Sequence, residues 1–469
     1  MPLRDQLAEF SSGLKFEDLP RDVVEFTRLF IRDQAGSTAV AGKIDPDRKL
    51  QVDAIGLPRF FKDMGGKKES SLVTQGCKVP CINAAFSNTV LSFGSFDSTH
   101  HVSSLHLSSC VIPAAMAVAE WKHAGGKDLI LAVVAGCEVM ARAGLALGSG
   151  NTYGRGFHPT AICTPIGCAV AAGKLLGLGR EAMAEAISIA AVQGSGAPPV
   201  VQGSRSPFTH RITSGRGAQA GVLAALLAQM GVVGVSSVFE GPRGFLAAHS
   251  TNPDPAKLTE NLGTVWETTH TTCSRFGVGG PMVPAIETLL RVLQKNHLRA
   301  EDIAHVECRM PTAQVSLVGS PVYPSIDASG ASNRSARYIL AFAAYQGEAG
   351  LEFSLQYKAE ANVKDPRHID LFKLIDVMAD PDLDKLYPAS WPCILTLRTK
   401  DGREFRETHN GHVKGTPENP FTAEEREKRF SKVVASALPK HRCDRMQDIL
   451  NRLEEIDDVS ELAKIIAAK

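Results

Sequence analysis

The first 265 residues carry the hydrophobic pattern of an all-helical domain. Leu7, Phe10 and Leu14 recur at helical spacing and predict a helix over 3–13, and a second amphipathic pattern predicts one over 20–40. A polar connection containing Gly and Lys follows the second helix. Further helices are expected over 82–91, twice between 109 and 147, and over 161–178, 180–191 and 218–230. Many of their positions are Ala or Gly, which let helices pack closely in a bundle core.

The pattern changes near residue 266. Residues 264–272 are rich in β-branched side chains, 303–310 alternate as a strand does, and 393–398 lead into Asp401-Gly402 as one arm of a hairpin. Helices are expected over 282–293 and 335–344. The fold class is therefore mainly α with a smaller α+β domain. We place the helical domain at 1–265, the α+β domain at 266–412, and helices over 423–437 and 444–468 in a C-terminal segment, 413–469.

Composition narrows the possible functions. The chain has 469 residues and a net charge of +1, which argues against a nucleic-acid partner or a polybasic membrane surface. Apolar runs are interrupted by Gly, Pro and polar residues, and the first residues lack a signal-like segment, so we expect a cytoplasmic protein. The ten cysteines include close pairs, but none has the neighbours that would complete four zinc ligands. We expect buried thiols and no metal.

The segment Gly154-Arg155-Gly156-Phe157-His158-Pro159-Thr160 holds the first candidate catalytic residue. Pro159 disfavours the helical conformation at His158, and Thr160 could cap the helix that follows. The positive end of that helix would keep the imidazole neutral and able to accept a proton. His158 is therefore a candidate general base. The alternative is a turn histidine that satisfies local backbone groups.

Two other segments collect polar side chains. Asp97, Thr99, His100, His101 and His106 lie within about ten residues, which is typical of a loop that lines a polar pocket. The alternative is an exposed loop that caps the next helix. Residues 194–214 are rich in Gly, Pro and Ser and predict a second loop. It carries the basic pair His210 and Arg211. These residues either take part in the functional site or are an exposed basic pair before the helix that starts at 218.

These motifs resemble the MmgE/PrpD family. Gly-Phe-His-Pro-Thr-Ala before a small-residue helix looks like the family's active-site turn, and Phe239-Glu240-Gly241-Pro242-Arg243-Gly244 resembles the turn that closes its first helical block. The family's Asp-Phe-Asp-Asp-Thr and His-Pro-Ser motifs match here at Asp97, Thr99 and His106. Ser95, Ser98 and Leu107 depart from them.

Two family lysines are replaced. On a gap-free match to the family's Lys-x-x-His-x-Gly motif, His210 takes the lysine position, Thr213 the histidine and Gly215 the glycine. Ser274 takes the position of a second lysine and leaves Arg275 as the cation. These departures bear on the substrate more than on the fold.

The resemblance implies that the C-terminal helices return to the first domain, that the α+β domain acts as a lid, and that the protein is a homodimer without a cofactor. It implies a cleft between the domains that gathers the candidate residues. The catalytic candidates are His158, His106, Asp97 and His210, and the substrate-binding candidates are Thr99, His101, Arg211, Arg275 and Tyr338.

Cations and histidines in one pocket suit a small di- or tricarboxylic acid. The family includes methylcitrate dehydratase, cis-aconitate decarboxylase and iminodisuccinate epimerase, and proton abstraction next to a carboxylate is the expected chemistry. Our first hypothesis is a cofactor-independent lyase, either a dehydratase or a decarboxylase. The alternatives are an epimerase of the same family and a carboxylate-binding protein without catalysis.

Overall fold

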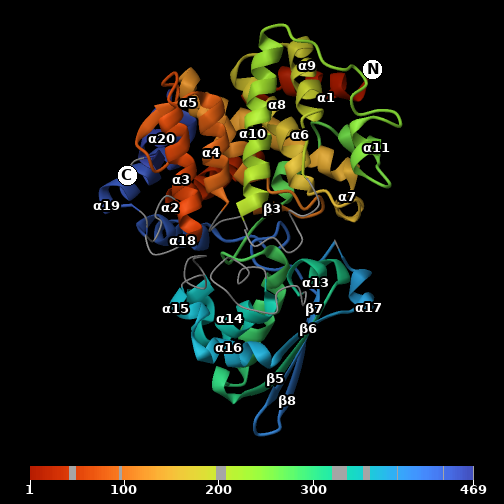
Figure 1. Cartoon of the computed structure of the whole chain (residues 1–469), viewed down its shortest axis with the longest axis vertical. Coiled ribbons are helices and arrows are strands. Elements are labelled where there is room, and N and C mark those ends of the chain that lie inside the picture. Colours follow the sequence, from red (N-terminus) through yellow and green to blue (C-terminus); the bar gives the residue numbers. More distant parts are fainter. Residues whose placement is uncertain are drawn as a thin grey trace.

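A computed structural model describes residues 1–41, 49–93, 98–196, 208–319, 335–351, 360–387, 389–436 and 438–467. The chain forms a helical body that holds both termini and a smaller body built on a sheet (Figure 1). Each body has its own hydrophobic core. The first core draws on residues 7–266 and 430–462, and the second runs from Phe276 to Val413.

The helical body is formed by two separate parts of the chain. Its N-terminal helices are α1 (Leu3–Gly13), α2 (Arg21–Ala41), α3 (Lys49–Met64), α4 (Cys81–Ser92), α5 (Leu107–Lys122), α6 (Gly126–Leu147), α7 (Ser149–Gly154), α8 (Pro159–Leu175), α9 (Arg180–Ala191), α10 (Phe208–Gln229) and α11 (Phe245–His249). Its C-terminal helices are α18 (Ala423–Ala435), α19 (Lys440–Asn451) and α20 (Ser460–Ala467). Short strands β1 (Ser70–Leu72) and β2 (Cys77–Val79) pair beside them.

Small residues set the distances between the central helices. A Cβ at Gly136 of α6 would lie 2.7 Å from the carbonyl oxygen of Gly167 on α8, and one at Gly221 of α10 would lie 2.5 Å from that of Pro165. Larger side chains would push these helices apart. The helix α6 is long and apolar enough to cross a membrane, but 89% of its apolar window is buried in the protein. It is the central helix of the core.

Most predicted helices are confirmed. The loop predicted over 194–214 is wrong for 208–214, because α10 already begins at Phe208, and 197–207 lie outside the described residues. Glycine and serine favour loops by local propensity, yet here they allow close packing. A Cβ at Gly215 would lie 2.8 Å from the carbonyl oxygen of Phe86 on α4, and one at Gly217 would lie 2.9 Å from the Thr164 Cβ on α8. His210 and Arg211 are thus residues of a helix and not of a loop before it.

Two further helix predictions need correction. The expected polar connection after residue 40 contains the helix α3. The single helix expected over 444–468 is two helices, because α19 ends at Asn451 and α20 begins at Ser460. The Asp458 side chain accepts a hydrogen bond from the Ser460 N–H at 2.8 Å and caps α20.

The smaller body is a four-stranded sheet with helices on one face. The strand order is β6-β5-β7-β8, with β5 and β6 parallel and the other pairs antiparallel. The strands are β5 (Ile303–Met310), β6 (Ile375–Ala379), β7 (Cys393–Thr399) and β8 (Glu404–His409). The helices of this body are α12 (Val283–Lys295), α13 (Thr312–Val318), α14 (Ala336–Leu351), α15 (Glu360–Val363), α16 (Pro366–Lys373) and α17 (Pro381–Asp384).

Alternation along the strands decides which face is covered. Val306, Cys308 and Met310 of β5 are buried in the second core, whereas Glu307 and Arg309 lie on the opposite face. The predicted strands at 303–310 and 393–398 are therefore confirmed. The short strand β6 was not predicted, because Ile375 is its only buried residue and it shows no clear alternation.

The chain that joins the two bodies is anchored on the helical one. The 3-10 turn η4 (Glu267–His270) packs on α6, and β4 (Thr271–Cys273) pairs with β3 (Ser98–His100) in an antiparallel ladder. The second core consequently begins at Phe276 rather than at residue 266. In the other direction, Phe430, Val433 and Val434 of α18 pack into the first core, so the C-terminal segment returns to it.

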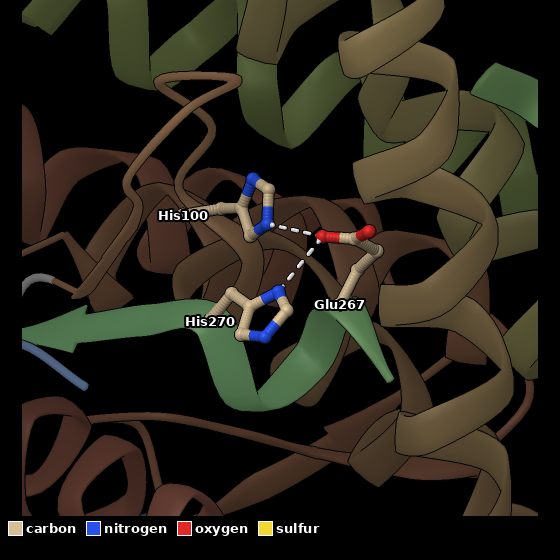
Figure 2. A group of neighbouring side chains, drawn as sticks. All are labelled: His100, Glu267 and His270. Carbon is tan, nitrogen blue, oxygen red and sulfur yellow. Dashed lines mark hydrogen bonds and ion pairs between the residues drawn. The ribbon is translucent and has the colours of Figure 1, made fainter. Parts of the chain in front are cut away.

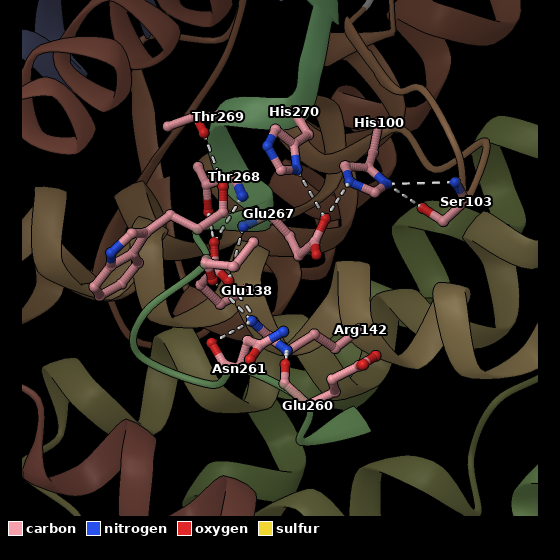
Figure 3. Close-up of polar contacts among 12 residues, drawn as sticks. His100, Ser103, Glu138, Arg142, Glu260, Asn261, Glu267, Thr268, Thr269 and His270 are labelled. Atoms are coloured by element: carbon pink, nitrogen blue, oxygen red, sulfur yellow. Dashed lines mark hydrogen bonds and ion pairs between the residues drawn. The ribbon is translucent and has the colours of Figure 1, made fainter. Parts of the chain in front are cut away.

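A buried ion pair on α6 holds this connecting chain in place (Figure 3). Arg142 is 1% exposed and donates hydrogen bonds to the carbonyl oxygens of Glu260, at 2.6 Å, and Val265, at 2.8 Å. The Glu138 carboxylate accepts hydrogen bonds from the Thr268 N–H at 2.6 Å and the Glu267 N–H at 3.1 Å. Burial raises the pKa of Glu138, and these hydrogen bonds together with Arg142 oppose that shift. Arg142 is thus a buried anchor of the connecting chain.

We expect Arg142→Met to lower the free energy of unfolding by about 3–5 kcal/mol, because it leaves the Glu138 charge and several carbonyl groups buried without their partner. Arg452→Met is the matched control, since Arg452 pairs with Asp448 at 2.8 Å on the surface and should cost less than about 1 kcal/mol. Urea denaturation followed by circular dichroism measures both. Equal effects in the two variants would contradict the anchoring role.

Candidate active site

His158 is the N-cap residue of α8, at the turn where the sequence places it. Pro159 occupies the first helical position, and His158 has the extended backbone that a following proline favours (φ −92°, ψ 112°). Thr160 lies inside the helix and does not cap it. The His158 ring is not the exposed group that a turn position suggests, because only 7% of the residue is accessible. Its imidazole is held inside the protein at the positive end of a helix.

His106 occupies the same position on a neighbouring helix, as the N-cap of α5. The centroids of the His106 and His158 rings lie 6.3 Å apart, and the rings are nearly parallel at 20°. The His106 N–H donates a hydrogen bond to Thr160 Oγ1 at 3.3 Å, which ties the start of α5 to the first turn of α8. The structure therefore brings together two histidines that are 52 positions apart in the chain, 106 and 158.

Aromatic rings enclose this histidine pair. The Phe93 ring meets His106 edge-on at 5.5 Å, and the Tyr153 ring meets His158 edge-on at 6.0 Å. Imidazole side chains can accept and donate protons near neutral pH, and the two helix N-termini favour a bound anion. This arrangement can carry acid–base chemistry on a carboxylate.

Thr99 and His101 lie where the two bodies meet. Thr99 of β3 pairs with Thr272 of β4, and the His101 N–H donates to the His270 carbonyl oxygen at 3.3 Å. The His101 ring stacks on the Trp391 indole of the smaller body, with centroids 4.9 Å apart and a 24° angle between planes. Trp391 was missed by the sequence reasoning, because nothing in its local sequence marks it as a partner of the 98–106 loop.

A small pocket opens beside these residues. Its lining includes Thr99, Thr272, Ser274, Arg275, Trp391 and Lys414. Arg275 makes ion pairs with Glu287 at 2.8 Å and Glu348 at 2.5 Å, so carboxylates of the protein already engage its guanidinium. Lys414 pairs with Glu425 at 2.8 Å. Lys414 is a cation that the sequence reasoning missed, and it lines the same pocket as Ser274.

Other predicted residues are placed elsewhere or lie outside the description. Tyr338 is fully buried in the second core, with its ring 6.2 Å from Phe342 and 6.3 Å from His368, and burial raises its pKa. Tyr338 therefore packs in the second core and does not line the pocket beside Thr99. Arg211 is partly buried in the first turns of α10. Asp97 and the side chain of His210 lie outside the described residues.

A second polar cluster joins the 98–106 loop to η4. Glu267 Oε2 lies 3.2 Å from His100 Nε2 and 3.2 Å from His270 Nδ1 (Figure 2). Burial raises the pKa of Glu267, but hydrogen bonds from the two histidines outweigh it and hold that pKa well below its ordinary value. Burial lowers the pKa of His100, whereas the hydrogen bond to Glu267 raises that of His270. The sequence reasoning missed Glu267 and His270, because no local motif links them to His100.

Comparison with known proteins identifies the family of this chain. Residues 5–258 match the MmgE/PrpD N-terminal domain, and residues 276–455 match the MmgE/PrpD C-terminal domain. The chain belongs to the MmgE/PrpD family. The family resemblance read from the motifs is therefore confirmed.

Relatives are similar over most of their length. A cis-aconitate decarboxylase from Aspergillus terreus is 26% identical over 482 residues, covering 98% of this chain and 95% of the relative. The cis-aconitate decarboxylase of Homo sapiens is 26% identical over 404 residues, covering 83% and 80%. That of Mus musculus is 25% identical over 483 residues, covering 98% and 93%. Together with the family, these relatives support an enzyme of the lyase class.

Gly280 allows a test of the contact between the Trp391 indole and the His101 ring in this MmgE/PrpD protein. A Cβ at Gly280 would lie 2.6 Å from Trp391 Cζ3, so Gly280→Ala must push the indole away from His101. We expect a loss of about 1–3 kcal/mol in the free energy of unfolding, as for other overpacked sites. Gly411→Ala is the control, since an added Cβ there meets nothing within 4 Å.

The second variant of that test removes the clash. In a Trp391→Leu background, the cost of Gly280→Ala should shrink, because the atoms that it strikes are gone. Denaturant titrations of the two single variants and the double variant give this coupling. If Gly280→Ala lowers the free energy of unfolding by the same amount in both backgrounds, the Trp391 indole does not pack against Gly280.

Proposed function

We propose that this protein is a lyase that removes carbon dioxide from a small tricarboxylic acid of the cis-aconitate type. The observation that carries the proposal is the pairing of His106 and His158 at the N-termini of α5 and α8, with ring centroids 6.3 Å apart. The names of the relatives that align with nearly the whole chain support the choice of reaction.

The reaction needs a proton donor and a site for negative charge. When the bond to the leaving carboxylate breaks, CO2 departs and its bonding electron pair stays on the carbon skeleton. One proton must then be delivered to carbon, so that a tricarboxylate and a proton give a dicarboxylate and CO2. A histidine near neutral pH can supply that proton, and its neighbour can replace it from solvent.

The carboxylates that remain on the substrate need anchors. The N–H groups at the start of α5 and α8 are one source, because helix N-termini attract anions. Lys414 and Arg275 beside Thr99 are a second source. Both cations already pair with protein carboxylates, so we expect a bound substrate to compete with Glu425 and Glu348 for them. Asp97, His210 and Arg211 stay candidates from the sequence.

An epimerase is the second candidate. Inverting a carbon centre requires one group that removes a proton and another that returns one, and the His106–His158 pair offers two such groups. The replacement of a family lysine by Ser274 is a further reason to keep it. A dehydratase and a carboxylate-binding protein without catalysis remain outcomes of the same experiment.

The test is incubation with cis-aconitate in heavy water, followed by NMR and CO2 detection. Release of CO2 with a dicarboxylate product supports the proposal. Addition or loss of water without CO2 indicates a dehydratase, and deuterium exchange with inversion of a suitable dicarboxylate indicates an epimerase. If the protein binds these acids saturably but converts none of them, the proposal that it is an enzyme is contradicted.

We expect His106→Asn and His158→Asn to lower kcat by about 10²–10⁴-fold, because asparagine keeps a polar side chain but cannot exchange protons near neutral pH. Asparagine is chosen because His158 is buried and an alanine there would also leave a void. His441→Asn, on the exposed side of α19, is the control and should keep full activity. Near-normal kcat in the His158 variant would remove that residue from the mechanism.

The homodimer implied by the family resemblance stays a prediction. Exposed apolar side chains follow α9 and α10, namely Val192, Met230, Val233 and Val235, with exposed fractions of 65%, 80%, 75% and 56%. A second subunit would cover such a surface. Light scattering at micromolar concentration should give twice the mass of one chain, and a stable monomer would contradict the prediction.

A further inference from the structure

The cluster of His100, Glu267 and His270 shares no residue with the His106–His158 pair and has the chemistry of a metal site (Figure 2). Each residue presents one ligand atom, and the three atoms all lie within 4.8 Å of one another. Two imidazole nitrogens and one carboxylate oxygen form a ligand set that Zn²⁺ and similar ions accept.

The separations fit one ion. Metal–ligand bonds of about 2.0–2.1 Å in a tetrahedral arrangement place neighbouring ligand atoms about 3.4 Å apart. Glu267 Oε2 is 3.2 Å from His100 Nε2 and 3.2 Å from His270 Nδ1. Small side-chain movements are therefore enough to place an ion between the three atoms.

The ligands are held by a second layer of contacts. The other ring nitrogen of His100, Nδ1, lies 2.6 Å from Ser103 Oγ, which fixes the ring and leaves Nε2 facing Glu267 (Figure 3). The backbone N–H of Glu267 is bound by the buried Glu138. Such outer contacts orient ligands in metal sites and strengthen binding.

Exposure and charge also suit an ion. His100 is fully buried, and the side chains of Glu267 and His270 are 15% and 51% exposed, so the cluster is reached from the His270 side. Within the described parts of the chain, the ion-pair partners of Glu267 are these two histidines. A divalent cation between the three ligand atoms places a full positive charge beside the largely buried Glu267 carboxylate.

We propose that His100, Glu267 and His270 bind one divalent transition-metal ion, with Zn²⁺ the best match, and a water or other small ligand in the fourth position. The ion ties the end of β3 to η4, so it braces the 98–106 loop against the chain that joins the two bodies. This inference is independent of the reaction proposed above.

The experiment is zinc binding to protein that has first been stripped with a chelator. Calorimetry with ZnCl2 and metal analysis after gel filtration should give one tight equivalent per chain. Co²⁺ in place of Zn²⁺ should give the strong visible absorption of a tetrahedral site. Neither readout depends on turnover, so failure here leaves the proposed reaction untouched, and the reverse also holds.

Variants separate this site from adventitious binding. Glu267→Gln and His270→Ala should each weaken zinc binding by at least about 100-fold, and Ser103→Ala, which touches no ion, by about 10–100-fold. His305→Ala is the matched control, because His305 pairs with Asp376 at 3.0 Å as an imidazole–carboxylate pair without a third ligand at that site among the described residues. It should leave binding unchanged.

The outcome that overturns the proposal is equally specific. Stripped protein that takes up no tight equivalent, or zinc affinity that is the same in His270→Ala as in the parent, would show a hydrogen-bonded cluster in which both imidazoles donate to Glu267. His270 is half exposed, so its removal leaves the fold intact and keeps the test decisive should Glu267→Gln fail to fold.

Discussion

The ion pair between Glu138 and Arg142 is the constraint on which the rest of the arrangement depends. Both residues are 1% exposed and lie in the buried part of α6, where two charges are costly to bury. That cost is offset by the backbone N–H and C=O groups of 260–268, a stretch with little regular structure. The charges on α6 and the irregular backbone therefore satisfy each other, and the path of the chain out of the helical body is fixed.

Fixing that path positions the candidate site. Directly after the anchored stretch come His270 and β4, and β4 pairs with β3 at the start of the loop that ends at His106. His106 begins α5, and its N–H is bound to Thr160 on α8. The two imidazoles thus meet because the 98–106 loop is fixed at both ends. The pairing of β3 with β4 holds its start, and the packing of α5 on α8 holds its end. Glycines at the α6–α8 contact let α8 pack closely on α6 as well.

The cations of the pocket come from segments far apart in the chain. Ser274 stands where the family resemblance leads one to expect a lysine, and Lys414 reaches the same pocket from the chain after β8. Arg275 and Lys414 are each paired with protein carboxylates. These ion pairs hold the two cations of the pocket in place, and a ligand carboxylate would have to compete with them.

The sequence by itself determined the elements whose signal is local. Amphipathic spacing predicted α1, strict alternation predicted β5, and the Gly-Phe-His-Pro-Thr turn predicted the family and placed His158 at the start of a helix, because these features depend on neighbours a few residues away. Tertiary structure decided the rest. It alone made residues 208–216 helical, buried Arg142 and Tyr338 in packing positions, and brought Trp391 to His101 and Glu267 to His100. Glycine and serine that favour loops in isolation become helix contacts when another backbone approaches closely. A polar side chain shows its partner only when segments far apart in the chain are folded together, since no local periodicity records such a contact.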